Sequence, residues 1–192
     1  MVLSKLRPQV QKSLSLLARR LGSKVKADYI TLASPIVALF VPISVYYDHL
    51  FLSVILLLVA SFFDILDGAV ARETGKARPA GAFLDSMIDR FVDTIYYVSL
   101  ILAGYDPLLV TLSLGFTITI TYSKARAASL GKPIEHRLLE RSDRIIIILV
   151  LLIITDIAPS YVMNIIMLTY MLGLLAAALY AVILGVKTLD RE

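Results

Sequence analysis

Five aspartates lie within one segment of 30 residues, and they interrupt two stretches that are otherwise apolar. The segment Asp64–Asp93 reads DILDGAVARETGKARPAGAFLDSMIDRFVD. If these stretches cross a membrane, each charge costs at least about 2.5–3.5 kcal/mol on insertion scales, so carboxylates there indicate a function. The chemistry open to grouped carboxylates is the binding of hard metal ions.

Four of these aspartates are spaced to meet at one depth. At 100° per residue, Asp64 and Asp67 fall within one arc of a helix, and Asp85 and Asp89 share one face of the next helix. Asp64 lies about 12 Å before the end of its stretch, whereas Asp85 and Asp89 lie about 6 and 12 Å after the start of theirs. Because the link between the stretches makes the two helices antiparallel neighbours, we expect the four carboxylates to converge.

Four carboxylates do not stay ionised together at low dielectric unless cations neutralise them. The sequence has no cysteine and only two histidines, His49 and His136, so oxygen ligands and Mg²⁺ or Mn²⁺ are favoured over zinc. The alternative is that the aspartates form ion pairs that hold the helices together. We favour this alternative for Asp93 alone, which lies deeper and one turn beyond the others. The arginines considered for such pairs are Arg72, Arg78 and Arg90.

The composition supports a membrane setting. Apolar residues make up 58% of the 192 residues, charged residues make up 18%, and the mean hydropathy is +0.82. An ordinary globular domain has about 45–50% apolar and about 25% charged residues, so a soluble globular protein, a disordered chain and a nucleic-acid module are excluded. The sequence predicts an all-α integral membrane protein with six transmembrane helices. These cover about residues 28–47, 50–72, 82–104, 107–130, 144–157 and 160–186.

Lysines and arginines lie at alternate ends of these stretches, and the three opposite links contain none. Since cations favour the cytoplasm, we expect a multi-pass protein of the cell membrane with both termini and the carboxylates facing the cytoplasm. Residues 1–26 alternate apolar and basic positions, which is typical of an amphipathic helix on the cytoplasmic surface, with a solvated basic tail as the alternative. We expect residues 27–192 to form a six-helix transmembrane domain.

The acidic segment contains a motif of eight fixed residues. It reads Asp64-x2-Asp67-Gly68-x2-Ala71-Arg72-x8-Gly81-x3-Asp85-x3-Asp89. This motif resembles the signature of the CDP-alcohol phosphatidyltransferase family, and the six-span layout with its amphipathic N-terminus is similar as well. The resemblance implies a homodimeric integral membrane enzyme. Such an enzyme moves a phosphatidyl-type group from a CDP-linked lipid to an alcohol and releases CMP.

The resemblance also implies roles for single residues. Four aspartates would bind two Mg²⁺ or Mn²⁺ ions, and Asp89 would in addition be the general base that takes the proton of the acceptor. The ligands are Asp64, Asp67, Asp85 and Asp89. The residues implied for the CDP-lipid are Asp28, Tyr29, Ile30, Thr31, Gly68, Arg72 and Arg78. The chain departs from the family at two places, where Ala27-Asp28 replaces a usual Pro-Asn and Arg78 replaces a small hydroxyl residue.

A second group of cations flanks the link between the fourth and fifth stretches. Taken by their positions alone, these residues would contact the headgroups of anionic lipids at the membrane surface. Their segments also resemble the acceptor region of the branch that makes phosphatidylinositol phosphate and its archaeal ether-lipid counterpart, and that branch uses inositol 1-phosphate. A phosphate dianion calls for several basic donors. The candidate acceptor residues are Lys124, Arg126, Arg141 and Arg144.

Other interpretations stay open at this point. Glycerol 3-phosphate is also a phosphomonoester and is the main rival acceptor. An apolar groove takes either a diacylglycerol or an archaeol lipid. A cation or proton transporter would also carry aspartates in its spans, but we would expect broken helices or repeated halves near the midplane. A membrane scaffold without activity does not call for paired carboxylates.

The charge asymmetry leads to a first prediction, on topology. We expect Lys76→Cys and His49→Cys, made singly in this cysteine-free chain, to react with a membrane-impermeant thiol reagent from opposite sides of sealed vesicles. Lys76 lies in a link with cations and His49 in a link without them, so the positive-inside tendency places them on opposite sides. Labelling of both cysteines from the same side contradicts the six-span arrangement.

Overall fold

The protein is described here from a computed structural model, in which residues 27–73 and 78–190 are placed. This part of the chain is helical and contains no strand, as predicted. The helices are α2 (Ala27–Tyr46), α3 (Leu50–Glu73), α4 (Pro79–Leu102), α5 (Pro107–Ser129), α6 (Arg141–Thr155) and α7 (Ser160–Leu189). Each begins and ends within about three residues of its predicted stretch. The amphipathic helix predicted for residues 1–26 lies outside the described residues.

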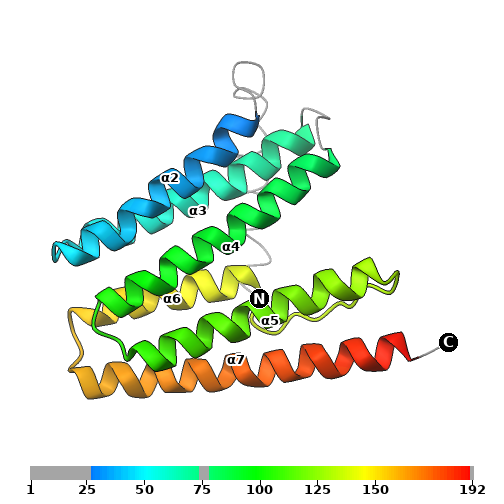
Figure 1. Ribbon diagram of the computed structural model, residues 1–192. Helices are drawn as coiled ribbons and strands as arrows, with labels where there is room; N and C mark the ends of the chain where they lie inside the picture. The colour runs from blue at the N-terminus through cyan, green and yellow to red at the C-terminus, as the bar shows by residue number, and fades with distance from the viewer. Residues whose placement is uncertain (1–26, 74–77, 191–192) are drawn as a thin grey trace, which may run out of the picture.

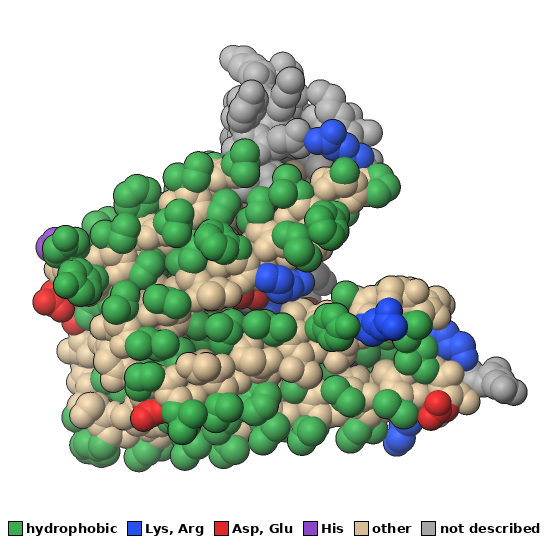
Figure 2. Space-filling view, viewed as in Figure 1, with side chains coloured by type: hydrophobic (Ala, Val, Ile, Leu, Met, Phe, Trp, Pro, Cys, Tyr) green, Lys and Arg blue, Asp and Glu red, His purple; other side chains and the backbone are tan. Residues whose placement is uncertain are grey.

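The helices form two groups that meet along α4. Helix α2 packs against both α3 and α4, α5 packs along α7 and contacts α4, and α6 contacts α3, α4 and α7 (Figure 1). The α2–α3, α4–α5 and α6–α7 links lie at one end of the molecule, and helices α3, α5 and α7 end at the other (Figure 1). At that second end the two groups diverge. Figure 2 shows a cleft between them, with acidic and basic side chains at its inner end.

The outer surface of the bundle is apolar. Large hydrophobic side chains point outward from every helix, for example Phe51, Phe83 and Ile146, which are 79%, 67% and 57% exposed. A contiguous apolar surface of this kind marks contact with lipid or with another protein. Three helices are long and apolar enough to cross a membrane, namely Leu50–Val70 within α3, α5 and α7. The fold is therefore that of an all-helical membrane protein.

Helices α2, α4 and α6 do not have the length and hydropathy of a simple spanning helix. The first half of α4 carries Asp85, Asp89 and Arg90, which lower its hydropathy. Helix α6 has 15 residues, so it is about 22 Å long at 1.5 Å per residue and shorter than the roughly 30 Å hydrocarbon core. In α2 the apolar helix found among the described residues is Leu32–Tyr46. Six complete spans remain a prediction.

A buried hydroxyl network joins the two groups of helices. The Tyr97 hydroxyl on α4 lies 2.8 Å from Thr117 Oγ1 on α5 and 2.8 Å from the Tyr170 hydroxyl on α7. Tyr97 and Thr117 are 1% and 0% exposed. Buried hydroxyls cost stability when they lose their partners, so this network fixes how α4 sits against α5 and α7.

We expect Tyr97→Phe to lower the free energy of unfolding by about 1–3 kcal/mol, because it leaves two buried hydroxyls without one partner. Denaturant unfolding in detergent measures the effect. The control is Tyr161→Phe on α7, where the side chain is 67% exposed and the change is expected to be within about 0.5 kcal/mol. Equal effects of the two substitutions contradict a role for the network.

Candidate functional site

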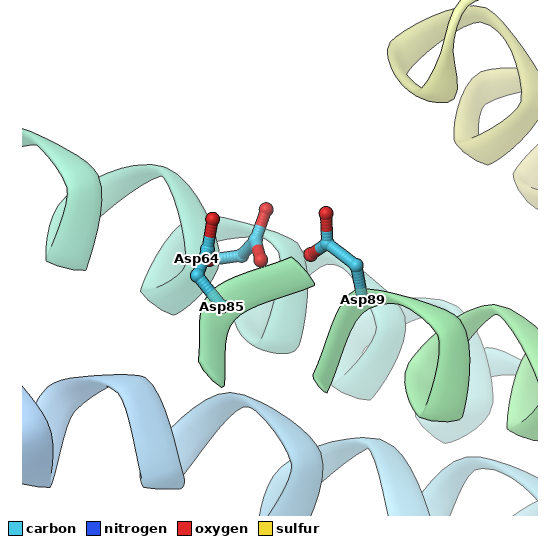
Figure 3. Close-up of side chains that lie close together, drawn as sticks. All are labelled: Asp64, Asp85 and Asp89. Carbon is cyan, nitrogen blue, oxygen red and sulfur yellow. The ribbon is translucent and has the colours of Figure 1, made fainter. Parts of the chain in front are cut away.

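Three carboxylates from α3 and α4 lie close together. Asp64 of α3 and Asp85 and Asp89 of α4 each offer one oxygen, and these oxygens lie within 4.8 Å of one another. Figure 3 shows the three side chains pointing into the same space from the two helices. The Asp64 and Asp89 side chains are each 17% exposed, so the group is partly buried. The structure thus brings together three of the four aspartates expected to converge.

The fourth aspartate, Asp67, lies less than one helical turn further along α3. It is 6% exposed and does not join the group of three carboxylates found among the described residues. Helix geometry explains the difference, since residues three apart are separated by about 60° around the axis and about 4.5 Å along it. The role of Asp67 as a metal ligand stays a prediction.

An arginine from α6 reaches across this group. Arg141 Nη1 donates a hydrogen bond to Asp64 Oδ2 at 2.5 Å and lies 2.9 Å from Asp89 Oδ1. Arg141 Nε donates to Asp93 Oδ1 at 3.4 Å. One guanidinium therefore connects α3, α4 and α6, and two of its three carboxylate partners belong to the candidate metal site.

A second arginine shares the same aspartate. Arg144 Nη2 donates to Asp93 Oδ2 at 3.5 Å, and Arg144 Nη1 donates to the Leu139 carbonyl at 2.8 Å. Asp93 is 5% exposed and Arg144 is 3% exposed. The prediction that Asp93 is an ion-pair partner is confirmed, but these partners come from α6 and were not among the arginines considered for it. Arg90 Nη1 instead lies 3.9 Å from Asp89.

The start of α6 is built to hold these two arginines. A capping box closes it, in which the Glu140 side chain accepts from the backbone of Asp143 and the Asp143 side chain accepts from the backbone of Glu140. Arg141 and Arg144 are three residues apart, so they lie on one face of the first turn. Cations are unfavourable at the N-terminus of a helix, since its dipole is positive there. Their placement therefore depends on the carboxylates of α3 and α4.

The other two predicted acceptor residues, Lys124 and Arg126, belong to α5 and have other contacts. Lys124 Nζ donates to the carbonyl of His136 at 2.8 Å. Arg126 is exposed, and its Nη1 lies 3.4 Å from Ser129 Oγ. His136, for which the sequence predicts no role, is 6% exposed and packs edge-on against Tyr180. Burial lowers the pKa of its imidazole, and the Lys124 ammonium lowers it further. No spacing or periodicity in the sequence signals this buried histidine.

The residues predicted to contact the CDP-lipid are only partly described. Asp28, Tyr29, Ile30 and Thr31 lie at the start of α2, and Arg72 lies near the end of α3, but their side chains are outside the described residues. Gly68 is half-buried on α3. Arg78 is exposed at the N-cap of α4. These positions lie along the first turns of α2 and α4 and the last turns of α3.

The donor set suits a hard divalent cation. All three grouped ligands are carboxylates, which Mg²⁺ and Mn²⁺ prefer. Asp89 Oδ1 is buried, and its contact with Arg141 Nη1 at 2.9 Å is an ion pair without hydrogen-bond geometry. A divalent cation among the three carboxylates would give this oxygen a further partner. The residues present therefore fit a metal ion.

Comparison with known proteins decides the family. The sequence model for CDP-alcohol phosphatidyltransferase matches residues 24–186. The chain belongs to this family. Archaetidylinositol phosphate synthase of Aeropyrum pernix is 40% identical over 126 residues, or 65% of each chain, which is just under two thirds of that protein's length. The protein of the same name from Methanothermobacter thermautotrophicus is 36% identical over 149 residues, 77% of this chain and 75% of its own.

Solved structures support the same fold. Phosphatidylinositol phosphate synthase of Mycobacterium tuberculosis with CDP-DAG bound has a TM-score of 0.77 at 22% identity, over 90% of this chain and 92% of its own. Its complex with manganese and citrate has a TM-score of 0.69 at 25% identity, over 92% of this chain and 87% of its own. In the present chain, Asp64, Asp85 and Asp89 of α3 and α4 lie within the region that the family model matches.

We expect Asp64→Asn, Asp85→Asn and Asp89→Asn each to weaken Mn²⁺ binding at least about tenfold, since loss of an outer partner of a metal ligand alone costs about 10- to 100-fold. Electron paramagnetic resonance of free Mn²⁺ in a titration of the folded protein measures the affinity. Asp48→Asn is the control, because Asp48 is an exposed link residue with φ 59°, a conformation that asparagine tolerates. Unchanged affinity in the Asp64 or Asp85 variant contradicts a metal site here.

Proposed function

We propose that this protein transfers a phosphatidyl-type group from a CDP-linked lipid to a hydroxyl of inositol 1-phosphate and releases CMP. The observation that carries the proposal is the group of Asp64, Asp85 and Asp89 with Arg141 directly beside it. Carboxylates suited to divalent cations and an arginine suited to a phosphate thus lie within contact distance. The relatives named archaetidylinositol phosphate synthase support the choice of acceptor.

We propose Asp64, Asp67, Asp85 and Asp89 as ligands of two Mg²⁺ or Mn²⁺ ions. When bound, such ions neutralise the diphosphate and stabilise the leaving phosphate in a displacement at phosphorus. A solved relative was crystallised with manganese, which supports use of a divalent metal. The half-buried setting of the three grouped carboxylates strengthens their interaction with a cation relative to bulk water.

The transfer itself is a single displacement. The acceptor hydroxyl oxygen forms a bond to the phosphorus that carries the lipid, and the bond from that phosphorus to the oxygen of CMP breaks. The Asp89 carboxylate takes the proton of the hydroxyl, and CMP leaves with the electron pair. Asp89 acts through its position more than through strong basicity, because general-base catalysis first requires hydrogen-bond reach of the proton.

The substrates occupy different elements in this proposal. Gly68, Arg72, Arg78 and the first turns of α2 hold the CDP end of the lipid. The acceptor phosphate is held by Lys124, Arg126, Arg141 and Arg144, because a dianion gains most from several charged donors. The names of the first relatives favour an archaeol lipid over diacylglycerol. The apolar outer faces of the helices accommodate either chain type.

We further propose the membrane arrangement that the charge pattern predicts. Six helices span the cell membrane, both termini and the carboxylate site face the cytoplasm, and residues 1–26 lie on that surface beside the catalytic domain of residues 27–192. Helices α3, α5 and α7 all end at the same end of the molecule (Figure 1), which supports this alternation. Two copies form a homodimer.

Acceptor choice is testable with purified enzyme, Mg²⁺ and CDP-archaeol or CDP-diacylglycerol, by measuring CMP release. We expect inositol 1-phosphate to exceed free inositol in kcat/KM by at least about 100-fold, because each charged hydrogen bond to the phosphate contributes about 1.5–3 kcal/mol. Lys124→Gln is expected to raise the KM for inositol 1-phosphate at least about tenfold and to leave the KM for the CDP-lipid unchanged. Faster turnover with glycerol 3-phosphate contradicts the assigned acceptor.

A further inference from the structure

The two sides of the Arg141 guanidinium face different groups. Nη1 contacts Asp64 and Asp89, which belong to the candidate metal site. Nε contacts Asp93, which lies one turn beyond Asp89 on α4 and outside the group of three carboxylates. The Arg141 side chain is 19% exposed. A single cationic group is thus shared between the metal site and a separate carboxylate.

A divalent cation and Arg141 Nη1 share two carboxylate partners, Asp64 and Asp89. Asp64 and Asp89 are two of the three grouped ligands, and both contact Nη1 at 2.9 Å or less. A cation bound there also repels the guanidinium. A bound cation would therefore compete with Nη1 for these partners and would leave the contact between Nε and Asp93 in place.

Asp93 is itself held firmly. It is 5% exposed, and its second oxygen accepts from Arg144, which is 3% exposed and also donates to the Leu139 carbonyl. Once Arg141 leaves Asp64 and Asp89, the set of Arg141, Asp93 and Arg144 carries two positive charges against one negative charge. This net positive charge suits a phosphate.

We propose that Asp93 is a positioning residue that retains Arg141 when a divalent cation takes Asp64 and Asp89, so that metal binding turns the Nη edge of Arg141 toward the acceptor phosphate. The proposal rests on the proposed function, since it concerns the same metal and acceptor. Metal and acceptor then bind cooperatively, and by linkage each increases the affinity of the other by the same factor.

The first test measures Mn²⁺ affinity by electron paramagnetic resonance, with no substrate present. Arg141→Gln removes the competitor and is expected to tighten Mn²⁺ binding about three- to tenfold. In the Asp93→Asn variant, Arg141 keeps only its contacts with Asp64 and Asp89. This variant is therefore expected to weaken Mn²⁺ binding by a similar factor. In the Arg141→Gln background the Asp93→Asn effect should shrink. A direct effect of the Asp93 charge on the metal would be equal in both backgrounds, and that result overturns the proposal.

The second test measures binding of inositol 1-phosphate by calorimetry with and without Mn²⁺. In the wild-type protein we expect Mn²⁺ to tighten this binding by at least about fivefold, within the usual range of coupling. The coupling should be lost in Arg141→Gln and reduced in Asp93→Asn, and Asp93→Glu should recover part of it. Coupling that persists in Arg141→Gln means that the metal itself holds the phosphate, which contradicts the proposal.

Arg90→Gln is the matched control. Arg90 Nη1 lies 3.9 Å from Asp89 and its side chain is 35% exposed, so this variant removes a charge near the metal site without removing a contact to Asp93. It should tighten Mn²⁺ binding less than Arg141→Gln and leave the coupling intact. If the wild-type protein does not bind Mn²⁺, the metal site of the proposed function fails. If it binds Mn²⁺ but Arg141→Gln does not tighten binding, only the present inference fails.

Discussion

The contacts of Arg141 with carboxylates of two other helices are the constraint on which the rest of the structure depends. Asp64, Asp89 and Asp93 lie in helices whose outer faces are apolar. Carboxylates in such a setting lose much of their hydration and need a compensating charge. Because the compensating arginine begins α6, the carboxylates of α3 and α4 fix where α6 starts. Helix α6 is short because its first turn already lies at the level of these carboxylates.

The same contacts explain why the bundle divides into two groups yet stays joined. The carboxylates belong to α3 and α4, and the arginines that reach them from another helix, Arg141 and Arg144, come from α6. The hydroxyls of Tyr97, Thr117 and Tyr170 connect α4 to α5 and α7. Arg141 and Arg144 connect α6 to α4 through Asp93. A site between two groups joined by breakable ion pairs leaves room for substrates that differ in size and polarity.

Much of this arrangement follows from the sequence, because hydropathy determines the helices and residues four apart share a helix face. The helix bounds and the meeting of Asp64, Asp85 and Asp89 are of this kind. The partners of Asp93 are different. Arg141 and Arg144 are about 50 residues away in the chain, and periodicity orders residues only within one helix. The buried position of His136 likewise depends on how a link folds against α7, for which its neighbours in sequence give no signal.

The start of α6 shows how an anion would have to be recognised here. A helix N-terminus commonly binds phosphate through its free backbone N–H groups. In α6 the capping box uses such groups for Glu140 and Asp143, and it adds two carboxylates at the helix end. An incoming phosphate would be repelled along the helix axis. It therefore has to approach the face that carries Arg141 and Arg144, which is also the face turned toward Asp93 and the metal-site carboxylates. In the proposed function, the cap would thus direct an anionic acceptor to the side of α6 that faces Asp89.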